Sequence, residues 1–143
     1  RLESRFFGSE QAGKQLLLIG RRHLRSNNSW MHNNLRLVKG KPRCTLFIHP
    51  DDARTRDISD GQRVVVESRV GRVEVAVEIT DDIMRGVVSL PHGFGHDRDG
   101  VRLRVARAHA GVSANDVTDD LFIDELTGNA AFNGVPVRLI AAR

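Results

Sequence analysis

Short apolar stretches of strand length recur along the chain, separated by segments rich in glycine and polar residues. Residues 72–79 alternate most regularly, with Val73, Val75, Val77 and Ile79 on one face. A period of two residues is typical of a strand with one buried face, so 72–79 is predicted to be a β-strand. The other predicted strands are residues 15–20, 44–48, 62–67, 87–90 and 135–140. Short strands in this number predict a mainly β fold, an all-β barrel with small helices.

Two segments between the strands have a different pattern. Pro50 followed by Asp51 and Asp52 predicts the start of a short helix. Proline suits the first helical turn, and acidic side chains suit the positive end of the helix dipole. Residues 101–108 fit either a strand or a helical turn, because their periodicity favours neither.

The length of the chain favours one domain. A chain of 143 residues can bury one substantial core but is short for two. Residues 1–14 have no clear period and are expected to be a lead-in from an upstream domain, followed by a barrel domain over 15–143. The first residue is Arg1 rather than Met, so we expect the chain to be part of a longer polypeptide.

Composition restricts the class of protein and its compartment. Hydrophobic residues make up 40% and charged residues 28% of the chain, which is typical of a soluble globular domain rather than a disordered one. No apolar run approaches the ~20 residues of a membrane span, and no signal peptide is recognisable at Arg1. Cys44 is the only cysteine, which excludes an internal disulfide and favours a cytoplasmic location.

The charge of the chain raises the question of a nucleic-acid partner. The net charge is +4 and the isoelectric point about 10.2. The basic residues are nevertheless scattered among 18 acidic ones, and the only dense cluster is residues 21–25. A local anion site therefore fits this cluster better than a long groove along a nucleic-acid backbone, and nucleic acid is considered unlikely.

The sequence contains no recognisable catalytic or metal-binding motif. The glycine-rich phosphate loops and the nucleophile elbow are absent, and Cys44 lies within an apolar strand pattern, which favours a core position. His92 and His96 are four residues apart, but Gly93 and Gly95 disfavour a helix that would bring them together. We therefore expect neither a catalytic residue nor a metal site in this chain.

Three polar clusters that follow apolar strands suggest a binding site instead. Arg21 and Arg22 come directly after a strand, where guanidinium groups can meet a phosphate. The hydroxyl and amide side chains of residues 26–29 add partners, although a solvated basic loop would have the same composition. Gly93 either forms a turn or lets a ligand approach the backbone, and Asn115 either begins a turn or contacts a base edge.

The order of these motifs is similar to a known family. The motifs are Leu17-Leu18-Ile19-Gly20-Arg21-Arg22 with Ser26-Asn27-Asn28-Ser29-Trp30-Met31, His49-Pro50-Asp51-Asp52-Ala53 with Asp60-Gly61, Val88-Ser89-Leu90-Pro91-His92-Gly93-Phe94-Gly95-His96, Asn115-Asp116-Val117-Thr118-Asp119, and Gly128-Asn129-Ala130-Ala131-Phe132-Asn133. Together they resemble the molybdopterin-dinucleotide-binding C-terminal domain of the dimethyl-sulfoxide-reductase family. That family of oxidoreductases includes formate dehydrogenases and nitrate reductases.

The resemblance implies a double-psi β-barrel that packs on upstream domains of the same polypeptide. In such proteins the domain holds one guanine-dinucleotide arm of a molybdenum or tungsten bis(molybdopterin guanine dinucleotide). The metal ligands and any iron–sulfur cluster lie mainly upstream. The cofactor-binding residues implied by the motifs are Arg21, Arg22, His23, Ser26, Asn27, Asn28, Ser29, His92, Gly93, Asn115 and Asn133. The chain departs from the family pattern at Asn133, where a lysine often stands, and at His23 and Arg25, where many members carry an acidic residue and a histidine.

The resemblance therefore predicts part of a molybdopterin-dependent oxidoreductase that is inactive as an isolated domain. Two alternatives remain at this stage. One is a stand-alone basic β-barrel that binds nucleic acid, and the other is a non-catalytic interaction module of a redox complex.

Overall fold

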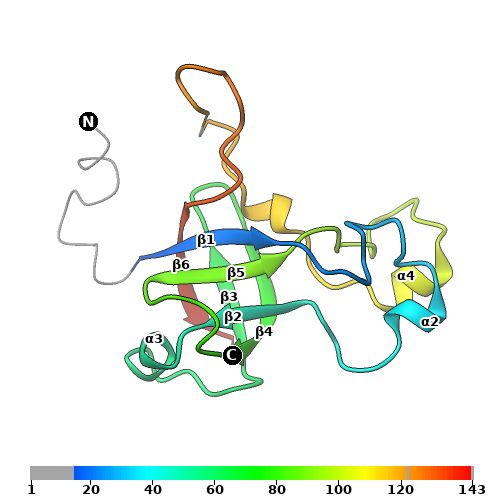
Figure 1. Cartoon of the computed structure of the whole chain (residues 1–143), viewed down its shortest axis with the longest axis horizontal. Helices are drawn as coiled ribbons and strands as arrows, with labels where there is room; N and C mark the ends of the chain where they lie inside the picture. Colours follow the sequence, from blue (N-terminus) through cyan, green and yellow to red (C-terminus); the bar gives the residue numbers. More distant parts are fainter. Residues whose placement is uncertain (1–14, 122, 143) are drawn as a thin grey trace.

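Six strands form a closed barrel in the computed structural model, which describes residues 15–121 and 123–142 (Figure 1). The strands are β1 (Leu16–Arg21), β2 (Thr45–Ile48), β3 (Arg63–Glu67), β4 (Arg72–Ile79), β5 (Val87–Pro91) and β6 (Val135–Ala141). Each begins and ends within about one residue of the predicted stretch. The mainly β barrel with short helices is therefore confirmed. The predicted lead-in, residues 1–14, lies outside the described residues.

The helices are short and lie in the connections. They are α2 (Leu35–Val38), α3 (Pro50–Arg54), α4 (Arg104–Ala108) and the 3-10 helix η1 (Ala114–Val117). The predicted helix at Pro50 is α3, where the His49 ring accepts a hydrogen bond from the Asp51 backbone N–H. Helix α4 decides the ambiguous stretch around residues 101–108 in favour of a helical turn.

The barrel combines two parallel with four antiparallel strand pairs. The strand order is β1-β5-β2-β4-β3-β6, with β1 parallel to β5 and β2 parallel to β4. The remaining pairs are antiparallel. A closed barrel leaves no sheet edge unpaired, so the connections need not protect one.

The barrel interior is filled with branched aliphatic side chains. Val73, Val75 and Val77 are buried, while Arg72 and Glu74 on the same strand are exposed, as the alternating pattern predicts. Leu46, Ile48, Val64, Val66 and Val88 are fully buried beside them. The strands supply most of the core, and Ala114 and Val117 of η1 add to it from the connection 92–134.

The strand pairing gathers the long connections at one end of the barrel. The C-terminal ends of β1 and β5 meet there, since Arg21 pairs with Pro91, and the antiparallel pair β2–β5 brings the start of β2 to the same end. We call this the loop end; it carries residues 22–44, 68–71 and 92–134. The opposite end, called the helix end, carries α3 and residues 80–86 (Figure 1).

Candidate functional site

Arg21 is the last residue of β1, at the loop end, and most of its guanidinium contacts are to other residues of this protein. Its guanidinium donates to the backbone oxygens of Ser89 at 2.5 Å and Thr45 at 2.7 Å, and it lies 3.6 Å over the Phe47 ring. Burial lowers the pKa of Arg21 to about 10. The side chain ties β1 to β5 and β2, so the described contacts give Arg21 a structural role beside its predicted one.

Arg22 is exposed and organises the loop that follows. Its guanidinium donates to the Asn28 side-chain oxygen. Asn27 and Asn28 have φ values of 40° and 61°, in the left-handed region that asparagine tolerates better than most residues. The Asn27 N–H donates to the His23 carbonyl oxygen at 3.3 Å, so this turn folds back on residue 23.

Glycines let three loop-end segments approach one another closely. A Cβ atom on Gly20 would lie 1.9 Å from the His92 Nε2 atom, and one on Gly93 would lie 2.0 Å from the Asn28 carbonyl oxygen. Gly93 also has a φ of 88°. Of the two roles left open for Gly93, the structure shows the positive-φ turn, and its close neighbour is the backbone of the loop 22–34. The approach of a ligand to this glycine stays a prediction.

A pair of histidines, which the sequence patterns did not predict, joins the same two segments. The His32 Nδ1 and His96 Nε2 atoms lie 2.7 Å apart, and the His32 ring is 4.4 Å from the Phe94 ring. His32 is buried, and burial followed by the nearby His96 lowers its pKa. Because 63 residues separate these histidines in sequence, no local spacing indicated the contact.

Asn133 and Asn115 come to the loop end from later parts of the chain. The Asn133 side-chain oxygen accepts a hydrogen bond of 2.8 Å from the Gly20 backbone N–H. Asn115 is exposed on η1, whose preceding residue Ser113 packs against Gly95. Asn133 therefore contacts the Arg21 strand end directly, whereas Asn115 lies on the same end without a contact to the other predicted residues.

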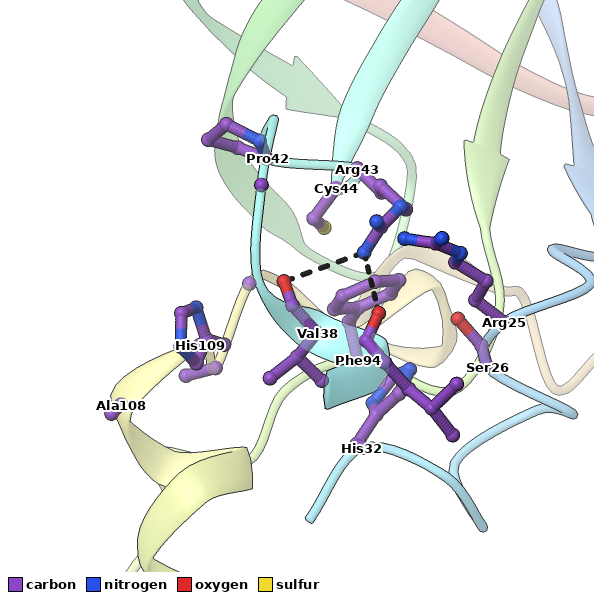
Figure 2. Close-up of a pocket in the computed structure, with 14 residues that line it drawn as sticks. Arg25, Ser26, His32, Val38, Pro42, Arg43, Cys44, Phe94, Ala108 and His109 are labelled. Atoms are coloured by element: carbon purple, nitrogen blue, oxygen red, sulfur yellow. Dashed lines mark hydrogen bonds between the residues drawn. The ribbon is translucent and has the colours of Figure 1, made fainter. Parts of the chain in front are cut away.

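Two neighbouring hollows at the loop end share Pro42 and Arg43 as a wall. The larger is about 380 Å³ and is lined by Arg25, the buried Ser26, Phe94 and His109, among others (Figure 2). Arg43 stands between the segments that line it and donates to the backbone oxygens of Leu37 and Val38. The smaller hollow, about 240 Å³, is lined by Arg21, His23, Lys41, Arg43 and Glu78, with Thr45 and Phe47.

Arginine side chains line both hollows, and the loop-end arginines contribute to lowering the pKa values of His23 and His92. Desolvation, then Arg43, Arg21 and Arg25, lowers the pKa of His23. Desolvation and then Arg22 lower the pKa of His92. Lys41 and Arg43 were not predicted as site residues, because they precede a strand and reach the loop end only through the antiparallel β2–β5 pair.

This set of groups can bind a polyanion. Guanidinium groups, left-handed turns and close glycine packing suit a phosphate-containing ligand. Among the described residues no group of three or more histidine, cysteine or acidic side chains could hold a metal ion. Burial raises the pKa of the half-buried Cys44 thiol, which disfavours the thiolate.

Comparison with known proteins agrees with this geometry. Residues 16–136 match the model of the "Molydopterin dinucleotide binding domain". The chain is 38% identical over 60 residues to a dimethyl sulfoxide/trimethylamine N-oxide reductase of Rhodobacter capsulatus, covering 42% of this chain and 7% of that protein. It is 45% identical over 47 residues to an F420-dependent formate dehydrogenase subunit alpha of Methanocaldococcus jannaschii, covering 33% of this chain and 7% of that protein.

A solved structure shows the same fold. Acetylene hydratase from Pelobacter acetylenicus superposes with a TM-score of 0.73 and 19% identity, over 99% of this chain and 19% of that one. The match to this chain thus spans less than a fifth of each of these larger proteins. In the part of the chain that the structure describes, no helix is long and apolar enough to span a membrane. The family model covers most of the chain, so this protein belongs to the molydopterin dinucleotide binding domains of the molybdopterin oxidoreductases.

Proposed function

We propose that this chain is the C-terminal domain of a molybdenum or tungsten bis-pterin oxidoreductase, and that its loop end holds the guanine-dinucleotide arm of the cofactor. The observation that carries the proposal is the convergence of Asn133, Gly20, His92, Gly93 and Asn28 through contacts between segments distant in sequence. These residues follow or precede different strands, and only a closed barrel brings them together.

The residues present suit the phosphate part of such a cofactor. Arg22 and His23 are the proposed partners of the pyrophosphate, with Asn27, Asn28 and Ser29 supplying amide, hydroxyl and backbone N–H groups. Ser26 is buried in the wall of the larger hollow and is proposed to contact the ligand from there. Arg21, already bound to Ser89 and Thr45, acts mainly by holding β1 in register beneath the phosphate.

The remaining assignments concern the nucleotide end. Asn115 is the proposed contact to the guanine edge, since its amide offers both a donor and an acceptor. His92 and Gly93 would line the cofactor site beside Asn28, and Asn133 orients the Gly20 backbone. The bound cofactor supplies the redox chemistry of its metal, and any iron–sulfur cluster belongs to an upstream domain.

The charge at the loop end predicts how binding depends on pH. Desolvation, and after it the nearby cationic arginines, lowers the pKa values of His23 and His92 in the free domain. A bound pyrophosphate would offset this repulsion and favour the imidazolium forms. Cofactor affinity should therefore rise as pH falls below about 6.5, the ordinary histidine value.

The test replaces Arg22 and Asn115 by alanine in the full-length protein that carries this chain. Loss of one charge-assisted contact to a desolvated phosphate should cost about 1.5–3 kcal/mol of binding, so Arg22→Ala should lower cofactor content. Asn115→Ala should weaken the guanine form more than a pterin without the nucleotide. Metal content, pterin fluorescence and melting temperature are measured on each purified variant.

Arg54→Ala is the matched control, because Arg54 is equally exposed but lies at the helix end beside Asp51. It should leave cofactor content unchanged. A fall in melting temperature with full cofactor content in Arg22→Ala would show a purely structural role for that residue. Unchanged content in both loop-end variants would refute the site.

Catalysis by the isolated domain is not expected. The 143-residue chain, supplied with cofactor, should show no turnover of formate, nitrate, or an N- or S-oxide, because large cofactor clefts are built between domains. Measurable oxidoreductase activity from this chain alone would contradict that expectation.

A further inference from the structure

The segment between η1 and β6 leaves the barrel and carries apolar side chains into solvent. We call residues 119–133 the acidic arm; it is the orange excursion in Figure 1. Leu126 is 95% exposed, Leu121 73%, and Ile123 and Phe132 about half. Large apolar side chains concentrated on one exposed segment usually mark a surface that another protein part covers.

The arm differs in charge from the rest of the chain. It contains Asp119, Asp120, Asp124 and Glu125 and neither lysine nor arginine, although the whole chain has a net charge of +4. The apolar side chains of the arm lie among carboxylates, of which Asp119 and Asp120 pair with Arg69 of the barrel. Such an acidic apolar surface is complementary to an apolar groove with lysine or arginine at its rim. The charge therefore selects a basic partner surface.

Internal hydrogen bonds give the arm a defined shape. The Asp124 carboxylate accepts from the Leu126 N–H at 3.1 Å and from the Thr127 N–H at 2.8 Å, and these Thr127 bonds lower the pKa of Asp124. The Asp124 N–H donates to the Asn129 carbonyl oxygen at 2.8 Å, and Ile123 and Ala130 form an antiparallel bridge. Asp124 thus fixes the turn that presents Leu126.

The base of the arm is attached to the barrel. Arg69, in the turn between β3 and β4, donates to the Asp119 carboxylate at 2.6 Å. This bond lowers the pKa of Asp119 to about 2, so the ion pair persists throughout the neutral range. A segment that is ordered before docking loses less conformational entropy when it binds.

We propose that the acidic arm docks into a basic-rimmed apolar groove on another domain of the same polypeptide. This inference rests on the proposed function, in which the chain is one domain of a larger enzyme. The matched part of the chain spans only 7% of each of the two curated relatives, so most of a protein of that size would lie outside it. Leu126 is the central contact, and the carboxylates select the groove.

The experiment measures amide hydrogen exchange of residues 119–133 in the full-length protein and in its Leu126→Ser variant. Met84→Ser is the control, because Met84 is 72% exposed at the helix end and lies outside the arm. Losing the burial of a leucine side chain should speed exchange in the docked arm by about tenfold or more. Met84→Ser should leave the arm as in the wild type.

Salt supplies a second readout that a merely structural effect would not give. Raising ionic strength from about 0.05 M to about 0.5 M should loosen the arm in the wild type, because screening weakens pairing between its carboxylates and a basic rim. Arm exchange that is identical in the wild type and Leu126→Ser, or independent of salt, would overturn the proposal.

Cofactor content and molecular mass are determined on the same samples. Protection of the arm in a protein that contains no pterin would support the docking surface while refuting the proposed cofactor role. Normal cofactor content with an unprotected arm would support the proposed cofactor role and refute the docking surface. Protection that appears only when the protein dimerises would mean that the arm docks on a second copy of the protein, and it would overturn the proposal.

Discussion

The two ends of the barrel satisfy their polar groups in different ways. At the helix end, the buried Asp52 accepts a 2.6 Å hydrogen bond from the Gly86 N–H, and Asp60 accepts one of 2.8 Å from the Ile79 N–H. At the loop end, Arg22 and Arg25 are exposed and face polar segments and hollows. These helix-end carboxylates are hydrogen-bonded within the protein, whereas the loop-end side chains of Arg22 and Arg25 are exposed.

This difference separates the helix end, where we expect substitutions to change stability, from the loop end, where we propose that a ligand binds. Closure of the sheet fixes the strands independently of the long connections, so residues 22–44 and 92–134 are free to specialise. Substitutions at the helix end should therefore change the free energy of unfolding, and those at the loop end should change ligand binding. Arg21 is the exception, because it lies at the loop end but bonds to the backbone of two strands, β5 and β2, and lies over the Phe47 ring of β2.

The largest expected effect comes from this exception. Arg21→Ala would leave the Ser89 and Thr45 carbonyl oxygens without their donor and remove the cation from the Phe47 ring. We expect the free energy of unfolding to fall by about 3 kcal/mol. Urea unfolding of the 143-residue chain measures it. Arg21→Lys should recover only part of the loss, since an ammonium cannot reproduce the planar fork. A stability equal to wild type would mean that the loop end contributes nothing to folding.

Asp52→Ala at the helix end should have the next largest effect. The Gly86 N–H and Arg56 would both lose an acceptor in a buried setting. The expected loss is about 2 kcal/mol of unfolding free energy, without any change in cofactor content of the full-length protein. Thermal unfolding and pterin content are measured together. A loss of cofactor in the folded variant would contradict the expectation that helix-end substitutions change stability and leave cofactor binding unaffected.

A pair of glycine substitutions compares the ends directly. Gly86 and Gly93 have φ values of 78° and 88°, so alanine at either position costs about 1–2 kcal/mol of backbone strain. A Cβ at Gly86 meets nothing within 4 Å, whereas one at Gly93 collides with Asn28. Gly93→Ala should therefore also displace the loop 22–34 and lower cofactor content. Equal cofactor content in the two variants would show that the loop 22–34 does not take part in cofactor binding.

The smallest expected effect is a dependence of stability on acid pH that arises at the loop end. The pKa values of His23, His32 and His92 are lowered in the folded domain, mainly by burial. As pH falls below about 6.5, the unfolded chain binds protons that the folded domain resists, so stability decreases until the folded pKa values are passed. Unfolding free energies between about pH 7.5 and 5 report the slope.

His32→Phe tests the buried member of that set. Phenylalanine keeps a ring beside Phe94 but cannot titrate. The variant should lose less stability on acidification than the wild type. An unchanged slope would assign the pH dependence to other groups.

Local pattern was sufficient for the strands and for α3. The alternation of residues 72–79 and the proline at position 50 act through neighbouring residues, and the structure agrees with both. The family was likewise recognisable from ordered motifs, and the comparisons confirm it. The strands and the start of α3 depend on residues that are near one another in the sequence, so a local pattern is enough to predict them.

The site shows the opposite case. Arg21 and Arg22 are adjacent and chemically identical, yet one guanidinium is bound to Ser89 and Thr45 and the other is exposed. The contact between His32 and His96 could not be anticipated from either motif alone. The sequence by itself determined which segments become strands, how many there are and which polar clusters follow them. Only the tertiary structure decided which clusters meet and which arginine is exposed, because barrel closure juxtaposes residues by strand pairing and not by sequence distance.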